Sequence, residues 1–206
     1  MIRIAVAKGY LFKETVKIFN QLDIEVDLTD ADRKLFLFDK SKKFQFLLVR
    51  PSDVPVYVEH GAAELGVVGK DILHEQAAPV VELLDLKFGF CRLAVAGLKN
   101  AKLKNNIRVA TKFVNSAKEF FIQKGLKAEI IKLYGSVELG PIVGLSDVIV
   151  DLVATGKTLK ENGLEVMETI LESTARLIAN PVLLQAKYEE LMPLINKISK
   201  KIQNKL

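Results

Sequence analysis

The chain has 206 residues, half of them hydrophobic, which is enough to build one large domain or two smaller lobes around a substantial core. A single cysteine, Cys91, excludes an intramolecular disulfide, and two histidines without metal-ligand spacing argue against zinc chemistry. The net charge of +5 is spread along the chain, which suits small polyanionic substrates better than nucleic acid, and the absence of a long apolar run or a signal peptide predicts a cytoplasmic protein without a membrane segment.

Strand-like and helix-like segments alternate through the first part of the chain. Short apolar runs predict strands at Ile2–Ala7, Phe44–Val49 and Leu65–Val68. Apolar residues at helical spacing predict a helix over Leu11–Leu22, and Asp53–His60 is typical of a short helix. This βα repetition indicates an α/β protein whose sheet is mostly parallel, with helices on its faces.

A second lobe is expected from the middle of the chain. A long strand at Leu86–Gly97 leads into it, and Ser116 with Glu119 forms a capping-box pattern that predicts a helix from there to Gly125. Further strands are expected at residues 107–110, 128–133, 148–152, 164–170 and 173–179. We therefore expect lobe I to comprise residues 1–87 and 178–206, and lobe II to comprise residues 88–177.

The C-terminal segment predicts a helix. Asn180 can cap its first turn and Pro181 suits the first helical position. Steps of four and three residues then form one continuous apolar stripe of Leu184, Tyr188, Leu191, Ile195, Ile198 and Ile202. Packing on its own lobe is the favoured interpretation of this stripe, and a subunit contact is the alternative.

The segment Val148–Leu159, VIVDLVATGKTL, predicts a strand that delivers a phosphate-binding loop. Gly156 lets the backbone turn, and amides at a helix N-terminus donate to an anion. Thr155 and Thr158 add hydroxyl donors, and the carboxylate of Asp151 at the strand end can accept hydrogen bonds from ribose hydroxyls. An ordinary strand–turn–helix with polar turn residues is the competing interpretation.

A Walker A loop is excluded by spacing. The motif requires a glycine five residues before Gly156-Lys157-Thr158, and that position holds Asp151. The preceding segment Tyr134–Asp147 is glycine-rich, as ligand-binding connections often are, and it contains Glu138.

Two cations follow expected strands of the first lobe. Lys8 and Arg50 each come directly after a strand, and the carboxyl ends of parallel strands lie at one edge of a sheet. They are therefore candidates for polyphosphate binding. Each alone is more often a solvated surface charge, and their shared position at strand ends makes the two interpretations about equal.

Blocks along most of the chain resemble the ATP phosphoribosyltransferase family. The most specific one is Glu138–Leu159, ELGPIVGLSDVIVDLVATGKTL, and others are AVAKGYL, RPSDVPVYVEHGAAELGVVGKDIL, LLDLKFGFCRLAVA and IRVATKF. The resemblance implies a two-lobed periplasmic-binding-protein-like fold with mainly parallel sheets and a cleft between the lobes. It also implies transfer of the phosphoribosyl group of phosphoribosyl pyrophosphate to N1 of ATP, with Mg2+ on the phosphates, as the first step of histidine biosynthesis.

The resemblance further implies a short-form catalytic subunit. Such subunits work with a regulatory subunit resembling histidyl-tRNA synthetase, and we expect a homodimer alone and a hetero-oligomer with that partner. The alternative is a non-catalytic two-lobed binding or sensor module for a phosphorylated sugar or nucleotide, because fold alone does not separate the two classes.

Residue roles follow from the same resemblance. The phosphoribosyl pyrophosphate would be bound by Glu138, Asp151, Ala154, Thr155, Gly156, Lys157 and Thr158. ATP would be bound by Lys8, Gly9, Leu11 and Asp71, and the catalytic cations would be Lys8, Arg33 and Arg50, with no side-chain metal ligand assigned. The sequence departs from the family pattern at Tyr10, where an arginine is usual, and more mildly at Glu64, where an aspartate is common.

Overall fold

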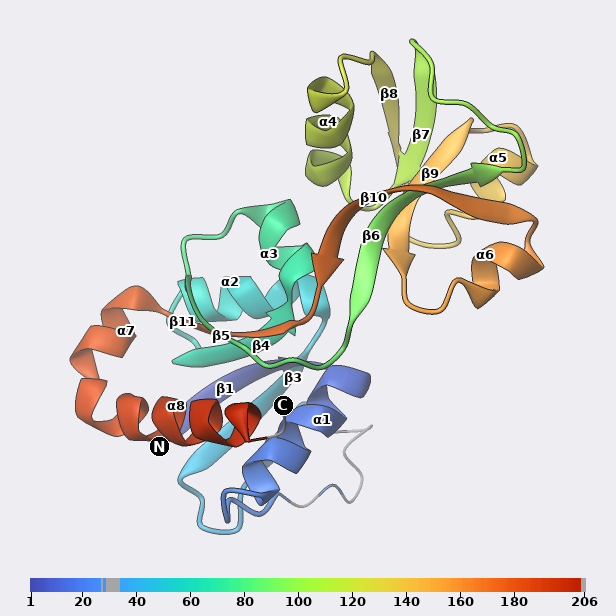
Figure 1. Cartoon of the computed structure of the whole chain (residues 1–206). Helices are drawn as coiled ribbons and strands as arrows, with labels where there is room; N and C mark the ends of the chain where they lie inside the picture. The colour runs from blue at the N-terminus through green and yellow to red at the C-terminus, as the bar shows by residue number, and fades with distance from the viewer. Residues whose placement is uncertain (27, 29–33, 205–206) are drawn as a thin grey trace. The chain divides into compact units, whose positions relative to one another are not determined.

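A computed structural model describes residues 1–26, 28 and 34–204 of the chain (Figure 1). The chain forms two compact units. Unit 1 comprises residues 1–73, 77–89 and 174–206, and unit 2 comprises residues 74–76 and 90–173. The sequence-based boundaries at 87/88 and 177/178 thus differ from these by two to four residues.

Unit 1 is built on a six-stranded sheet with the order β2-β3-β1-β4-β11-β5. Its strands are β1 (Ile2–Ala7), β2 (Phe36–Phe38), β3 (Phe44–Val49), β4 (Leu65–Gly69), β5 (Val81–Asp85) and β11 (Ala175–Ala179). The central strand β1 is parallel to β3 and β4, whereas β2, β11 and β5 pair in antiparallel fashion. The carboxyl ends of β3, β1 and β4 therefore lie at the same edge.

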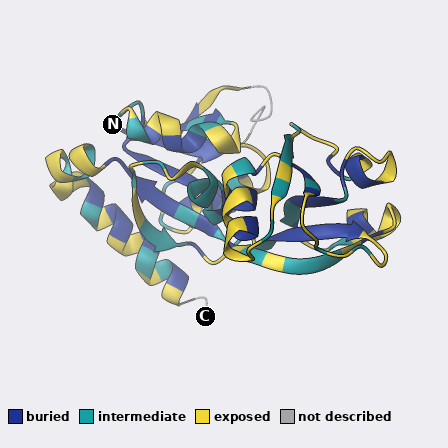
Figure 2. Cartoon of the chain, turned by 90° about the horizontal axis from the view of Figure 1, so that it is seen from above, coloured by how far each residue is buried: buried dark blue, intermediate teal, exposed yellow. Residues whose placement is uncertain are grey.

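Helices cover both faces of the unit 1 sheet. They are α1 (Tyr10–Asn20), α2 (Val54–Glu59, after a 3-10 turn at Pro51–Asp53), α3 (Lys70–Gln76, whose residues 74–76 belong to unit 2), α7 (Pro181–Ala186) and α8 (Tyr188–Gln203). Alternate residues of β1 point to opposite faces, so Ile4 and Val6 share a core with α1 and α8, while Ala5 and Ala7 share one with α2. Figure 2 shows the resulting pattern, with buried residues concentrated on strands and exposed ones on outer helical faces.

The C-terminal helix packs on its own unit, as predicted. Leu191, Ile195, Ile198 and Ile202 of the stripe are buried in the unit 1 core. The Asn180 side chain accepts a hydrogen bond from the Leu183 amide at 2.9 Å, so the predicted cap is confirmed. The stripe is not continuous, however, because the helix is interrupted at Lys187 between α7 and α8, and Tyr188 is exposed.

Unit 2 contains a five-stranded sheet with the order β10-β6-β9-β7-β8. Its strands are β6 (Cys91–Leu98), β7 (Ile107–Thr111), β8 (Ala128–Lys132), β9 (Val148–Val153) and β10 (Leu164–Ser173), and its helices are α4 (Val114–Gln123), α5 (Leu139–Ile142) and α6 (Lys157–Glu161). β7 is parallel to β8 and β9, and β6 is antiparallel to β9 and β10. The predicted α/β class is confirmed, but the sheets are mixed rather than mainly parallel, because β2, β5, β6, β10 and β11 pair in antiparallel fashion.

Two local predictions differ from the structure. The expected strand Leu86–Gly97 is broken, since Lys87 and Gly89 adopt positive φ angles of 59° and 69° between β5 and β6. Ser116 lies inside α4 rather than at its cap, and its hydroxyl donates to a Glu75 carboxylate oxygen at 2.8 Å. That carboxylate also accepts from the Asn115 and Ser116 amides, so Glu75 supplies the first-turn partner that the capping-box prediction assigned to Ser116.

A buried carboxylate ties three segments of unit 1 together. Glu64 is only 1% exposed and accepts hydrogen bonds from the Arg3 amide at 2.7 Å, the Arg3 guanidinium at 3.1 Å and the Lys187 ammonium at 2.9 Å. Burial by itself would raise the pKa of Glu64, but these hydrogen bonds outweigh it and lower the pKa to about 2.

Candidate functional site

The loop after β9 has the geometry of an anion-binding turn. β9 ends at Val153, and α6 begins at Lys157. Gly156 precedes α6 with a left-handed φ of 75°, a conformation that glycine adopts without a steric penalty. The Thr155 hydroxyl oxygen accepts a long hydrogen bond of 3.4 Å from the Lys157 amide. First-turn amides of a helix have no partner within the helix and are available to an anion.

A cavity of about 210 Å³ opens over this loop. All seven residues predicted to bind phosphoribosyl pyrophosphate contribute to its lining, which consists of Glu138, Asp151, Leu152, Val153, Ala154, Thr155, Gly156, Lys157, Thr158 and Leu159. The structure therefore brings Glu138, which immediately precedes α5, next to a loop that follows it by more than ten residues. Their predicted roles in binding remain predictions.

Asp151 is the most chemically distinctive residue of this cavity. Its Oδ1 atom is buried and has no hydrogen-bond partner among the described residues. Burial raises the pKa of Asp151, and the negative charge of Glu138 adds to this, whereas the nearby Lys112 lowers it. A buried carboxylate oxygen without a donor is suited to accept a hydrogen bond from a hydroxyl group of a ligand.

Lys112 is a residue of this site that the sequence analysis did not select. It follows β7, the parallel neighbour of β9, and its ammonium nitrogen lies 3.6 Å from Asp151 Oδ1. The Thr111 hydroxyl before it donates to the Val150 carbonyl at 2.6 Å, which fixes the ends of β7 and β9 together. The rule that selected Lys8 and Arg50, a cation directly after a parallel strand, would also have selected Lys112.

The candidate cations of unit 1 lie at one edge of its sheet. Ala7 pairs with Val49 at the ends of β1 and β3, and the Lys8 amide donates to the Val49 carbonyl at 3.0 Å. Lys8 and Arg50 follow directly on these two strands, and both are exposed.

The remaining unit 1 candidates surround the same strand ends. Gly9 has a φ of 89° before α1, Leu11 lies in the first turn of α1, and Asp71 is buried in the first turn of α3 after β4. Arg33, the other predicted catalytic cation, lies outside the described residues.

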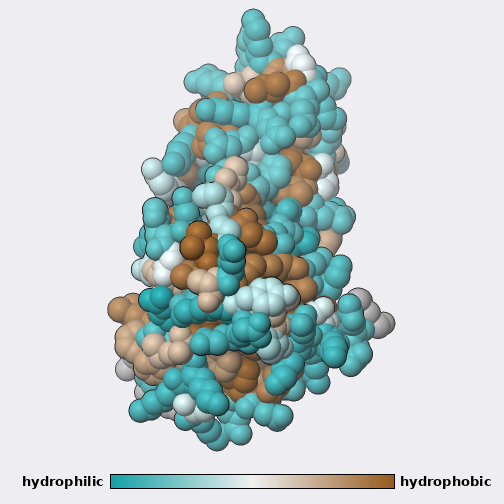
Figure 3. Space-filling model, turned by 90° about the vertical axis from the view of Figure 1, so that its left-hand side faces the viewer, coloured by the Kyte–Doolittle hydropathy of each residue, from teal (hydrophilic) through white to brown (hydrophobic). Residues whose placement is uncertain are grey.

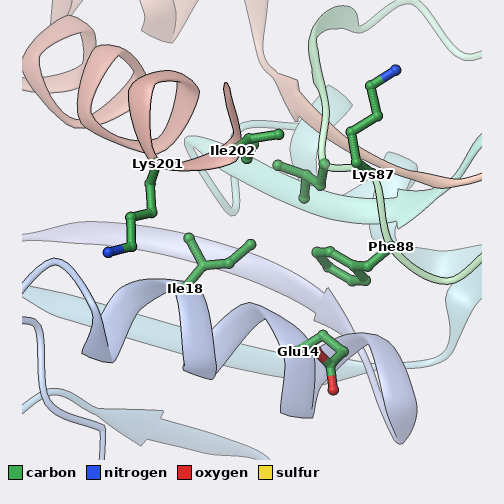
Figure 4. A pocket seen from close by; sticks show the side chains of 7 residues that line it. Glu14, Ile18, Lys87, Phe88, Lys201 and Ile202 are labelled. Atoms are coloured by element: carbon green, nitrogen blue, oxygen red, sulfur yellow. The ribbon is translucent and has the colours of Figure 1, made fainter. Parts of the chain in front are cut away.

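Unit 1 also holds a cavity that is lined by none of the predicted site residues that the structure describes. It has a volume of about 270 Å³ and lies between α1, the segment after β5 and the end of α8 (Figure 4). Ile18, Phe88 and Ile202 give it an apolar floor, and Glu14 and Lys201 border it. Lys87 at its rim is paired with Asp85 at 3.0 Å.

Apolar side chains also reach the surface of unit 1 in patches bordered by hydrophilic ones (Figure 3). For example, Val182 of α7 is 71% exposed.

No helix among the described residues is long and apolar enough to cross a membrane. Those residues also include no cluster of three or more histidine, cysteine or acidic side chains arranged to hold a metal ion.

Two-unit α/β folds of this kind occur among solved binding proteins. The periplasmic aliphatic sulphonate binding protein SsuA from Escherichia coli superposes with a TM-score of 0.63 over 98% of this chain and 72% of that chain, at 14% identity. This likeness shows the fold class alone and confirms the predicted periplasmic-binding-protein-like architecture.

Sequence comparisons are more specific than the fold. The family model HisG, ATP phosphoribosyltransferase, matches residues 50–204. The ATP phosphoribosyltransferase of Caldanaerobacter subterraneus subsp. tengcongensis is 55% identical over 96% of both chains, and that of Citrifermentans bemidjiense is 46% identical over 98% of both. A chain of the ATP phosphoribosyl transferase (HisG:HisZ) complex from Thermotoga maritima superposes with a TM-score of 0.86 over 99% of this chain and 100% of that chain, at 33% identity.

The chain belongs to the ATP phosphoribosyltransferase family. Membership confirms the predicted class, a transferase, and does not favour the alternative of a non-catalytic binding or sensor module.

Proposed function

We propose that the chain transfers the phosphoribosyl group of phosphoribosyl pyrophosphate to N1 of ATP, releasing pyrophosphate in the first step of histidine biosynthesis. The observation that carries this proposal is the unit 2 cavity, which combines an anion-binding turn with the unpartnered Asp151 carboxylate. A sugar that carries both a 5′-phosphate and free ribose hydroxyls satisfies both features. Family membership supplies the reaction class.

The phosphoribosyl end of the substrate is assigned to unit 2. Amides and hydroxyls of residues 154–158 hold the 5′-phosphate, and the Asp151 and Glu138 carboxylates accept hydrogen bonds from the ribose hydroxyls. Lys8 and Arg50 of unit 1, together with Arg33, are assigned to the pyrophosphate and ATP phosphates, since fixed cations match that charge. Gly9, Leu11 and Asp71 are assigned to the ATP side.

The chemistry requires positioning rather than a protein nucleophile. Adenine N1 attacks the anomeric carbon, the bond to the pyrophosphate oxygen breaks, and the electron pair leaves with pyrophosphate. The positive charge formed on the adenine ring is relieved by loss of a proton from its amino group. Cations at the unit 1 sheet edge stabilise the charge that develops on the departing pyrophosphate.

Magnesium enters this proposal as part of the substrates. Mg2+ keeps several waters and prefers substrate phosphates to an all-protein cage. We therefore assign the ion to the phosphates and name no side-chain ligand.

Regulation is assigned to a partner. The chain matches the full length of a chain from the Thermotoga maritima HisG:HisZ complex, which supports a short-form catalytic subunit. We propose that it forms a homodimer alone and a hetero-oligomer with a regulatory subunit resembling histidyl-tRNA synthetase, in the cytoplasm.

The direct test is an assay of the purified chain with ATP, phosphoribosyl pyrophosphate and Mg2+. We expect pyrophosphate release together with a new nucleotide that carries one added phosphoribosyl group, detected by mass spectrometry. Omitting ATP should abolish both signals, which separates transfer from hydrolysis. Failure to form the adduct, with and without the regulatory partner, would contradict the proposed function.

A further inference from the structure

We propose that Lys112 is a positioning residue of the phosphoribosyl site, which holds the Asp151 carboxylate ready for a ribose hydroxyl by pairing with Oδ1 without donating a hydrogen bond to it. This inference rests on the proposed function, because it assumes that Asp151 accepts a hydrogen bond from the sugar. Neither the sequence motifs nor the family resemblance assigned a role to Lys112.

The distance between the two groups carries the proposal. Lys112 Nζ lies 3.6 Å from Asp151 Oδ1, which is within the range of an ion pair but too long for a hydrogen bond. Oδ1 accordingly has no hydrogen-bond partner among the residues described. The lysine therefore balances the charge of the carboxylate and leaves its oxygen free to accept a ligand hydroxyl.

The position of Lys112 is fixed by its neighbours. Thr111 bonds to the Val150 carbonyl through its hydroxyl, and the same oxygen accepts from the Phe113 amide at 2.8 Å. The Phe113 ring is 1% exposed, and Lys112 Nζ lies 5.1 Å from its centroid, in the range of a cation–π contact. These contacts keep the ammonium group at the end of β7 beside the end of β9.

The surroundings of Asp151 show why a cation is needed there. Glu138 adds a second negative charge to the lining, and the β6 residue that pairs with Asp151 is the uncharged Ala94. Lys157 also lines the cavity, but its side chain is 80% exposed and lies 3.8 Å from Glu161. Lys112 is thus the cation that directly opposes burial and Glu138, which both raise the pKa of Asp151.

The positive charge of Lys112 favours the ionised form of Asp151. Removing Lys112 should raise the pKa of Asp151 further, so that a larger fraction of Asp151 is protonated as the pH falls. A protonated carboxyl group is a poorer acceptor for a ribose hydroxyl. The affinity for the sugar should therefore fall. The pH at which binding weakens on acidification should also move to a higher value.

The experiment compares three variants by calorimetric titration with ribose 5-phosphate between pH 5 and 8. For Lys112→Met we expect about two- to fivefold weaker binding at pH 6 and a smaller loss at pH 8, the size expected for one partly exposed charge contact. Lys112→Arg should restore the affinity and the pH profile. Lys102→Met removes an exposed lysine of unit 2 outside this cavity, and it should match the parent chain.

A double-mutant cycle separates positioning from direct contact. In the background of Asp151→Asn, Lys112→Met should cause less than a twofold further loss, since the group it acts through is gone. Additive losses, or a loss that is the same at every pH, would overturn the proposal and indicate a phosphate contact or a general structural role. Thermal unfolding of each variant identifies any that fail to fold, and Lys112→Gln then replaces Lys112→Met.

The outcome is distinguishable from failure of the proposed function. Ribose 5-phosphate binding does not depend on turnover. If the effects of the Lys112 and Asp151 substitutions on binding are coupled but no phosphoribosyl-ATP is formed, the proposed reaction is refuted and the positioning role stands. If phosphoribosyl-ATP is formed but the losses of binding caused by the two substitutions are additive, only the positioning role is refuted.

Discussion

The two units differ in the groups that lie near the carboxyl ends of their parallel strands. In unit 2, the largely buried Asp151 carboxylate lies two residues before the end of β9, is paired with Lys112 after β7 and lines a cavity of about 210 Å³. In unit 1, the exposed residues Lys8 and Arg50 directly follow β1 and β3. These two strands pair through Ala7 and Val49 at their ends. The strand ends of unit 2 thus combine a buried hydrogen-bond acceptor with a paired cation, whereas β1 and β3 of unit 1 are followed by exposed cations.

This difference divides the proposed reaction between recognition and charge stabilisation. A buried acceptor contributes strongly to binding a neutral hydroxyl, because an unpaired buried group is costly and a ligand relieves that cost. Exposed cations contribute little to ground-state affinity, yet they act on charge that increases as pyrophosphate departs. Substitutions in unit 2 should therefore affect sugar binding, and those in unit 1 should affect turnover.

The sharpest test of this division is Arg50→Ala. Loss of a group that stabilises developing charge typically lowers kcat by about 10²–10³-fold, and we expect that range here with less than about a fivefold change in the Kd for ATP. Steady-state kinetics and calorimetric titration of ATP measure the two quantities. Arg50→Lys should recover part of the rate, since it keeps the charge but loses the planar pair of donors.

A control for net charge is available in the same unit. Lys197→Ala removes an exposed cation of α8 and should leave kcat unchanged. The assignment of catalysis to the unit 1 edge is refuted if Arg50→Ala keeps the parental kcat. It is also refuted if the fold-loss in ATP affinity equals the fold-loss in kcat.

The next largest effect concerns stability rather than activity. Glu64→Gln removes the negative charge that Arg3 and Lys187 share, and we expect roughly 3 kcal/mol lower stability at pH 7, the equivalent of lowering a pKa from 4.5 to about 2. Because the folded-state pKa is lowered, this contribution is fully present above the unfolded value of 4.5 and is lost as the pH falls toward 2. Urea unfolding of both chains at pH 7 and pH 3 measures the difference.

Glu189→Gln is the matched control for this stability measurement. Glu189 is exposed in the first turn of α8, where a carboxylate contributes less than about 1 kcal/mol through the helix dipole. A Glu64→Gln penalty that is no larger than that of Glu189→Gln, or that persists undiminished at pH 3, would show that the buried pair does not stabilise unit 1.

Sequence reasoning succeeded where the signal is local. Ile2–Ala7 and Phe44–Val49 form strands with the predicted bounds, and the Asn180 cap lies within four residues of the amide it accepts from. The residues of the anion-binding turn are contiguous in the sequence. A strand, a glycine and the start of a helix are therefore enough to place them in one cavity.

The errors and omissions arise from long-range contacts. Ser116 matches a capping box, but Glu75, some forty residues earlier, provides the carboxylate at that helix start. The role of Glu64 depends on Lys187, which is 123 residues away, and that of Lys112 depends on the pairing of β7 with β9. No local periodicity encodes these partners.

The smallest expected effect tests the departure from the family pattern at Tyr10. Tyr10 is the first residue of α1, directly after Lys8 and Gly9, and it is 59% exposed. Tyr10→Arg adds a further cation at the edge of the unit 1 sheet, and an exposed charge contact of about 0.2–1 kcal/mol corresponds to roughly 1.5- to 5-fold tighter ATP binding. The gain should shrink as salt is raised, because exposed charges are screened over about 10 Å at 0.1 M ionic strength. Titration of ATP at low and high salt measures it, with Tyr10→Gln as the control that removes the ring without adding charge. Equal affinities of the arginine and glutamine variants at low salt would mean that the existing cations already satisfy the phosphates, and the exposed edge of unit 1 would then need no arginine at this position.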